Sequence, residues 1–126
     1  MSETTVASRL QRRCLLLTTE VALIEELAGA APAGWRVNVS ASPEEAGDFA
    51  EILQHRFVLL DLDDEAIDPL NIISKLRGEM MLNVPVIGLG GSPVLRDAAR
   101  IARADRFFRR DEAAAVLHQF CMQFDW

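Results

Sequence analysis

The hydrophobic positions of the chain alternate between two periods, one typical of buried strands and one typical of helices. Short apolar runs are separated by longer segments in which apolar residues return every three or four positions. The runs that predict strands are Cys14–Leu17, Trp35–Val39, Phe57–Leu62, Val84–Leu89 and Arg106–Phe108. The first, third and fourth are apolar enough to be parallel strands buried on both faces.

Each predicted strand is followed by a segment with helical spacing. Three of these segments begin with a capping residue before a proline, at Ser42-Pro43, Asp68-Pro69 and Ser92-Pro93, a combination that favours a helix start. The apolar faces expected of the five helices are Ile24, Leu27, Ala28 and Ala31; Ala46, Phe49, Ala50 and Leu53; Ile72, Ile73, Leu76 and Met80; Leu95, Ala98, Ala99 and Ala102; and Ala113, Val116, Leu117, Phe120, Cys121 and Phe124.

The strand–helix order, repeated five times with short connections, predicts an α/β fold. Its parallel sheet is expected to carry helices on both faces, joined by right-handed crossovers. The 126 residues fit one domain, 1–126, in which we expect residues 1–11 to form a partly flexible tail. Cys14 and Cys121 fall in a predicted strand and a predicted helix, so we expect two buried free thiols.

Composition and charge limit the classes of binding partner that we expect for this chain. The net charge of −6 argues against direct binding of nucleic acid. No apolar run approaches the roughly 20 residues that span a bilayer, and the polar start Met1–Thr5 lacks the apolar core of a signal peptide. We therefore expect a cytoplasmic protein with neither a membrane nor a nucleic-acid partner.

The candidate chemistry lies where the third apolar run ends in a cluster of carboxylates. Asp61 closes this run, and Asp63, Asp64, Glu65 and Asp68 follow it. In an open α/β sheet, ligands and chemistry lie beyond the carboxyl ends of the strands. Asp61 is therefore the best candidate for a reactive side chain. Asp61 and Asp63 are also candidate metal ligands, although acidic loops without a defined ligand geometry bind cations weakly.

These features resemble the receiver domain of bacterial response regulators, whose sheet has the flavodoxin-like strand order 2-1-3-4-5. The resemblance covers about Arg12 to Phe124. It rests on Val58-Leu59-Leu60-Asp61-Leu62, Ile67-Asp68-Pro69-Leu70, Val84-Pro85-Val86-Ile87-Gly88-Leu89 and the segment Ala104–Arg110. It implies that order for this chain, a signalling rather than an enzymatic function, and Asp61 in the place of the phospho-accepting aspartate.

The resemblance also shows where the pocket is degenerate. Family members accept a phosphoryl group from a histidine kinase with Mg²⁺ held by carboxylates, two of which normally follow the first strand. Here Thr18 and Thr19 match those two, and Glu20 either supplies one carboxylate or opens a helix. Gly90 replaces the hydroxyl residue after the fourth strand, and Arg110-Asp111 replaces a Lys-Pro pair. The expected pocket around Asp61 is therefore Thr18, Thr19, Glu20, Asp63, Gly90 and Arg110, with no cofactor required and Mg²⁺ in doubt.

A basic segment forms the second feature, with six of the 13 basic residues between positions 96 and 110. Arg96, Arg100 and Arg103 have the spacing of one helix face. In the resembled family, the fourth helix, fifth strand and fifth helix form the output and dimerisation surface. With Phe107, which stands where the family has its aromatic switch or is plain core, these arginines predict an interaction face. The alternative is a solvated face with Asp97 and Asp105 as partners.

The sequence is compatible with three functions. The favoured one is a receiver-like domain that works by protein interaction or dimerisation without phosphorylation, for example ahead of an effector domain in a transcription regulator. The second is an authentic phospho-accepting receiver, in which Glu20 and Asp63 help to hold Mg²⁺. The third is a phosphatase of the haloacid-dehalogenase type, whose first motif resembles Asp61-x-Asp63. That motif opens its own fold, however, and Glu65 stands where Thr or Val is usual.

Overall fold

A single five-stranded parallel sheet organises the protein, which is described here by a computed structural model covering residues 11–125. The strands are β1 (Arg12–Leu17), β2 (Trp35–Ser40), β3 (Val58–Asp61), β4 (Val86–Leu89) and β5 (Arg106–Phe108). Their order is β2-β1-β3-β4-β5, and every neighbouring pair is parallel. The predicted α/β class and strand order are confirmed. The expected tail at residues 1–11 lies outside the described residues, except for Gln11.

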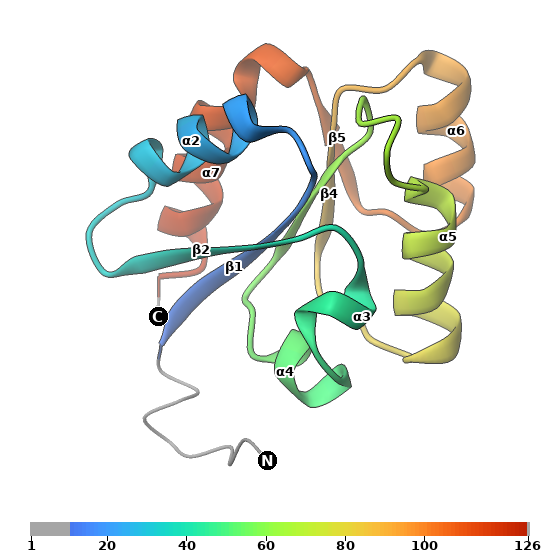
Figure 1. Ribbon diagram of the computed structural model, residues 1–126, viewed down its shortest axis with the longest axis horizontal. Coiled ribbons are helices and arrows are strands. Elements are labelled where there is room, and N and C mark those ends of the chain that lie inside the picture. The colour runs from blue at the N-terminus through green and yellow to red at the C-terminus, as the bar shows by residue number, and fades with distance from the viewer. Residues whose placement is uncertain (1–10, 126) are drawn as a thin grey trace.

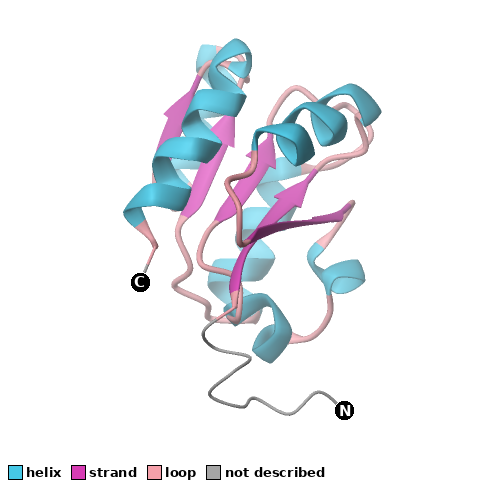
Figure 2. Ribbon diagram, turned by 90° about the vertical axis from the view of Figure 1, so that its left-hand side faces the viewer, coloured by secondary structure: helices cyan, strands magenta, loops and turns pink. Residues whose placement is uncertain are grey.

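Helices cover both faces of the sheet (Figure 1). They are α2 (Val21–Ala30), α3 (Pro43–Ala46), α4 (Phe49–Leu53), α5 (Pro69–Ser74), the π-helix η1 (Lys75–Glu79), α6 (Pro93–Ile101), the 3₁₀-helix η2 (Arg110–Glu112) and α7 (Ala113–Gln123). One face carries α2 and α7, and the other carries α5 and α6 (Figures 1 and 2). The carboxyl ends of the strands therefore form an edge between two helical layers.

The three predicted helix starts are confirmed. Ser42, Asp68 and Ser92 each accept a hydrogen bond from the backbone N–H three residues later, and each is followed by a proline in the first helical turn. These caps satisfy N–H groups that have no partner within the helix.

Two apolar clusters fill the space between the sheet and its helices. Leu15 and Leu17 of β1 point into the cluster under α5 and α6, whereas Cys14 and Leu16 point into the cluster under α2 and α7. Alternate residues of a strand face opposite sides of a sheet, so burial of both sets identifies β1 as an interior strand.

Both cysteines are free and buried, as expected. Burial raises the pKa of the Cys121 thiol to about 12. Burial also raises the pKa of Cys14, with a further increase from the nearby Cys121. Neither thiol is therefore ionised at neutral pH.

The second predicted helix is broken, which corrects the sequence expectation. Gly47 interrupts it with a φ of 125°, a conformation that favours glycine, and Asp48 starts α4 by accepting the N–H of Glu51. As a result Ile52 is buried, whereas Leu53, which was expected in the core, is 55% exposed. The side chain of Phe49 lies outside the described part of the structure.

Two smaller differences concern α2 and α5. The buried face of α2 is formed by Leu23 and Leu27, while Ala28 is exposed. The third predicted helix changes to a π-helix at Lys75, which accepts the N–H of Met80. The apolar face keeps facing the core through this change, because Leu76 is fully buried.

Arg77 anchors this π-helix to the sheet. Its guanidinium donates to the carbonyls of Leu82, Val84 and Arg103 at 2.8–3.0 Å and pairs with Asp105 at 2.8 Å. The same Asp105 oxygen accepts the Val86 N–H at 2.8 Å. Arg77 therefore holds together the segment that leads into β4 and the segment that leads into β5.

We expect Arg77→Met to lower the free energy of unfolding by about 3 kcal/mol, because it leaves buried carbonyls without donors. Chemical denaturation of the variant and the parent measures this change. The exposed Arg36 offers a matched control, and Arg36→Met should change the free energy by about 0.5 kcal/mol or less. Equal stability of Arg77→Met and the parent protein would show that the anchor is not important.

Candidate functional site

Asp61 ends β3 as a completely buried carboxylate, with 0% of its surface exposed. Its Oδ2 accepts the hydroxyl of Thr18 at 2.8 Å, and its Oδ1 accepts the backbone N–H of Asp63 at 3.1 Å. Arg110 Nε lies 3.4 Å from the same Oδ1. Both oxygens are therefore engaged within the protein, as a buried charge requires.

The topology brings these groups together. β1 and β3 are neighbours with Leu17 opposite Leu60, so Thr18 and Asp61 both lie at the carboxyl edge of the sheet. Arg110 reaches the same edge from η2, directly after β5. The predicted meeting of Thr18, Asp61 and Arg110 is thus present in the structure.

Arg110 makes an ion pair with Asp61 rather than a hydrogen bond. Its Nε is buried and has no hydrogen-bond partner among the described residues. Asp111, the next residue in the sequence, pairs with Arg109 and not with Arg110. The charge of Arg110 therefore remains available to balance that of Asp61.

Asp64 is a part of the site that the sequence pattern did not single out. It is 3% exposed, and its Oδ2 accepts the Thr19 N–H at 2.5 Å and the Thr19 hydroxyl at 2.7 Å, while the Thr18 hydroxyl oxygen lies 3.3 Å away. Its Oδ1 accepts the Ala66 N–H at 2.9 Å. The sequence points to Asp64 only indirectly, because the hydroxyls of Thr18 and Thr19 after the first strand favour a nearby acceptor.

The pKa of Asp64 reflects two opposing effects. Burial raises this pKa, but the hydrogen bonds that the carboxylate accepts from Thr19 and Ala66, with a smaller contribution from the nearby Thr18 hydroxyl, outweigh burial, so the pKa lies below its ordinary value of 3.8. Asp64 is therefore held in its charged form at neutral pH.

Thr18 stands between the two buried carboxylates. A hydroxyl has one proton to donate, and the shorter distance of 2.8 Å assigns it to Asp61. The Thr18 oxygen also accepts the N–H of Glu20 at 3.0 Å. Glu20 itself is exposed at the start of α2, where its side chain makes no capping hydrogen bond.

Asp63 faces the β4 loop. Its Oδ1 accepts the Gly91 N–H at 2.9 Å. Gly90 has a φ of 77°, and a Cβ atom placed on it would lie 2.1 Å from Asp63 Oδ2. The carboxylate of Asp63 therefore occupies the space that a hydroxyl side chain at position 90 would need.

The residues around Asp61 do not fit a Mg²⁺ site. Mg²⁺ requires nearly octahedral coordination by oxygen, with carboxylates among its ligands. Within residues 11–125, no group of three or more His, Cys, Asp or Glu side chains is placed to hold a metal ion. Asp61 and Asp64 are hydrogen-bonded inside the protein, and Asp63, the other candidate ligand, binds a backbone amide.

The predicted arginine face needs correction. Arg96 turns inward, where it donates to the carbonyls of Gly90 at 2.8 Å and Phe108 at 3.1 Å. Arg103 lies beyond the end of α6 with a φ of 82°, so it leaves the helical face. Of the three arginines, Arg100 alone stays on the outer face of α6. The alternative partner Asp105 binds Arg77.

Arg100 and Phe107 form a contact on that surface. The guanidinium carbon of Arg100 lies 5.1 Å from the centre of the Phe107 ring and the side chain pairs with Asp97 at 2.8 Å. Phe107 is partly buried and also packs against the core. A cation over a ring in this position is a favourable contact, and it joins α6 to β5.

Comparison with solved structures identifies the fold. A two-component response regulator from Clostridium difficile superimposes with a TM-score of 0.71 and 14% identity, over 90% of this chain and 95% of that one. The receiver domain of a signal transduction histidine kinase from Syntrophus aciditrophicus gives 0.71 and 19%, over 90% and 89%. The receiver domain of a sensor histidine kinase from Pseudomonas aeruginosa PAO1, with a magnesium ion in its active-site cleft, gives 0.65 and 18%, over 90% and 97%.

The chain therefore has the fold of response regulator receiver domains, as predicted. No protein-family model matches its sequence, and no curated protein matches it either. No helix within residues 11–125 is long and apolar enough to cross a membrane.

The lowered pKa of Asp64 predicts acid sensitivity. A lowered folded-state pKa gives stability that is present in full above the ordinary value of 3.8 and is lost as the pH falls below it. We expect the free energy of unfolding to decrease more steeply between about pH 5 and pH 2.5 in the parent protein than in Asp64→Asn. Denaturant titrations at several pH values measure both slopes.

Thr19→Val provides an intermediate case. It removes the hydrogen bond from the Thr19 hydroxyl to Asp64 but keeps the hydrogen bond from the backbone N–H. Its pH dependence should lie between those of the parent and Asp64→Asn. Parallel curves for all three proteins would contradict the assigned role of Asp64.

Proposed function

We propose that this chain is a single receiver-like signal-transduction domain, which acts through protein interaction without phosphorylation of Asp61. The observation that carries this proposal is the state of the Asp61 carboxylate. Thr18, the Asp63 amide and Arg110 already supply the hydrogen bonds and positive charge that it needs. The domain has the receiver fold, but its buried aspartate is used as a structural ion.

The missing parts of phosphoryl transfer support this proposal. A carboxylate that accepts a phosphoryl group attacks with one oxygen, while metal ions and cations offset the charge on the transferred group. Here Thr18 and Thr19 donate hydrogen bonds at the place where the resembled family has metal-binding carboxylates. Gly90 offers no hydroxyl, and Asp63 fills the space beside it.

A phospho-accepting receiver remains the second candidate. The observation that favours it is the retention of Asp61 at the end of β3 with a cation, Arg110, within 3.4 Å. The phosphatase alternative has less support, because the Asp63 carboxylate binds the Gly91 amide rather than facing Asp61. We therefore propose a signalling domain and not an enzyme.

An exposed apolar pair on α6 supports the interaction role. Val94 is 80% exposed and Ile101 is 84% exposed, and their seven-residue separation places them on one side of the helix. Arg100 lies over Phe107 beside them. We propose that this face of α6 and β5 binds a protein partner in the cytoplasm, a second copy of the chain being the partner we test, and that it contacts neither nucleic acid nor membrane.

Sedimentation equilibrium tests this function. We expect the protein to form a dimer that Ile101→Asp and Arg100→Glu weaken by about tenfold or more, because each places a buried negative charge in the interface. Asp61→Asn should change the dissociation constant by less than about twofold.

Val21→Asp is the matched control, since Val21 is 65% exposed on α2, on the other side of the sheet. This change should leave the dimer intact. A dimer lost in Asp61→Asn but retained in Ile101→Asp would reverse the proposal, and a monomeric parent protein would exclude self-association.

A further inference from the structure

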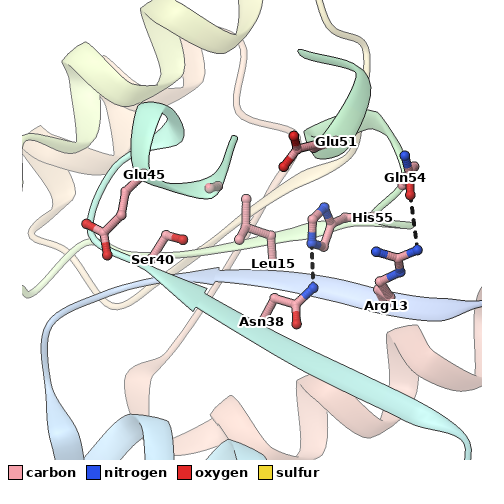
Figure 3. Close-up of a pocket in the computed structure, with 9 residues that line it drawn as sticks. Arg13, Leu15, Asn38, Ser40, Glu45, Glu51, Gln54 and His55 are labelled. Atoms are coloured by element: carbon pink, nitrogen blue, oxygen red, sulfur yellow. Dashed lines mark hydrogen bonds between the residues drawn. The ribbon is translucent and has the colours of Figure 1, made fainter. Parts of the chain in front are cut away.

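A polar cavity lies between the paired strands β1 and β2 and the broken helical segment α3–α4 (Figure 3). Its volume is about 290 Å³, close to the lower end of the roughly 300–1,000 Å³ usual for small-molecule sites. Its lining does not include Asp61, Thr18 or Arg110, so it is separate from the site around Asp61. The lining residues that matter for binding are Leu15, Asn38, Ser40, Glu45, Glu51 and His55.

The Ser40 hydroxyl points into this cavity from the end of β2. Ser40 is 7% exposed, and its backbone carbonyl accepts the Thr18 N–H at 3.1 Å. Its hydroxyl makes no hydrogen bond within residues 11–125, and Figure 3 shows it directed toward the side of Leu15. Because buried hydroxyls are normally hydrogen-bonded, this one is available to a molecule in the cavity.

Two carboxylates that line the cavity lie at opposite ends of α3. Glu45 Oε2 accepts the N–H of Ala41 at 3.4 Å, just before the helix begins. Glu51 comes from α4, and a Cβ atom on Gly47 would collide with its Oε2, so this carboxylate lies directly after the end of α3. Figure 3 shows Leu15 on the cavity floor between the two. Neither carboxylate forms an ion pair with any residue that the structure describes.

The two basic side chains of the lining make other contacts. His55 is 6% exposed, its Nδ1 lies 3.1 Å from the Ile52 carbonyl, and its Nε2 lies 2.9 Å from the Asn38 amide nitrogen. Nδ1 therefore carries the proton, and Nε2 accepts from Asn38. Burial lowers the pKa of His55, so the ring is neutral at neutral pH. Arg13 Nη2 donates to Gln54 Oε1 at 3.0 Å, and we assign this arginine no role in binding.

Two separated carboxylates with an apolar floor between them match a molecule that has a cation at each end and an apolar middle. An ammonium group carries three donors and forms strong, charge-assisted hydrogen bonds to carboxylates. The Ser40 hydroxyl offers one of these ammonium groups a further acceptor. A metal ion fits less well, because within residues 11–125 no group of three or more His, Cys, Asp or Glu side chains is placed to hold one.

We propose that this cavity binds a short aliphatic diamine, such as 1,4-diaminobutane or 1,5-diaminopentane. One ammonium group binds the Glu45 carboxylate and the Ser40 hydroxyl, the other binds the Glu51 carboxylate, and the methylene chain between them lies over Leu15. The site does not depend on the function proposed for Asp61.

Isothermal titration calorimetry of the full chain with 1,4-diaminobutane and 1,5-diaminopentane tests this proposal. At about 0.15 M salt, which screens weak attraction to surface charges, we expect one-to-one binding with a dissociation constant of roughly 0.1–1 mM for at least one of them. n-Butylamine has a similar chain but a single ammonium group, so it should bind at least about tenfold more weakly.

Variants of the lining residues locate the site. Glu45→Gln and Glu51→Gln should each weaken binding by about tenfold, because each replaces a charge-assisted contact with a neutral one. Ser40→Ala should weaken binding by about threefold, because it removes one neutral hydrogen bond. Glu44→Gln is the matched control, since Glu44 lies on the same helix as Glu45 but pairs with Lys75. It should change the affinity by less than about twofold.

Glu45 is exposed, so its substitution decides the matter even if Glu51→Gln is unstable. The absence of saturable binding by both diamines would overturn the proposal. Unchanged affinity in Glu45→Gln, equal binding of n-butylamine, or an equal loss of affinity in Glu44→Gln would overturn it as well.

Discussion

The charge of Asp61, buried at 0% exposure, is the constraint on which the carboxyl edge of the sheet depends. An unpaired carboxylate in this position would cost several kcal/mol. Thr18 follows β1, Asp63 follows β3, and Arg110 follows β5. Residues from the ends of three strands therefore contact the Asp61 carboxylate. The order β2-β1-β3-β4-β5 places these ends close enough to do so.

The same arrangement supports the proposal that this chain uses the receiver fold without phosphorylation of Asp61. After β1, Thr18 and Thr19 donate hydrogen bonds, and the acceptors are Asp61 at the end of β3 and Asp64 in the loop that follows it. Donors and acceptors are thus paired inside the protein, which stabilises the edge without a metal. Asp64, held in its charged form by its hydrogen bonds, completes this pairing.

Much of the fold could be predicted from the sequence, because hydrophobic period and proline-containing caps act locally. The burial of β1 and β3 and the start of α5 at Asp68 are examples. The break at Gly47 depends on a backbone conformation that the apolar spacing does not record. The role of Asp64 and the inward turn of Arg96 depend on partners far along the chain, which no local pattern specifies.

The central claim is that Asp61 is a structural ion and not a phosphoryl acceptor. Intact-mass spectrometry after incubation with acetyl phosphate and Mg²⁺ tests it most directly, with a known phosphorylatable receiver treated in parallel. The account predicts a phosphoryl adduct on the control receiver and none on this protein. An adduct on this protein that is absent from Asp61→Asn would contradict it.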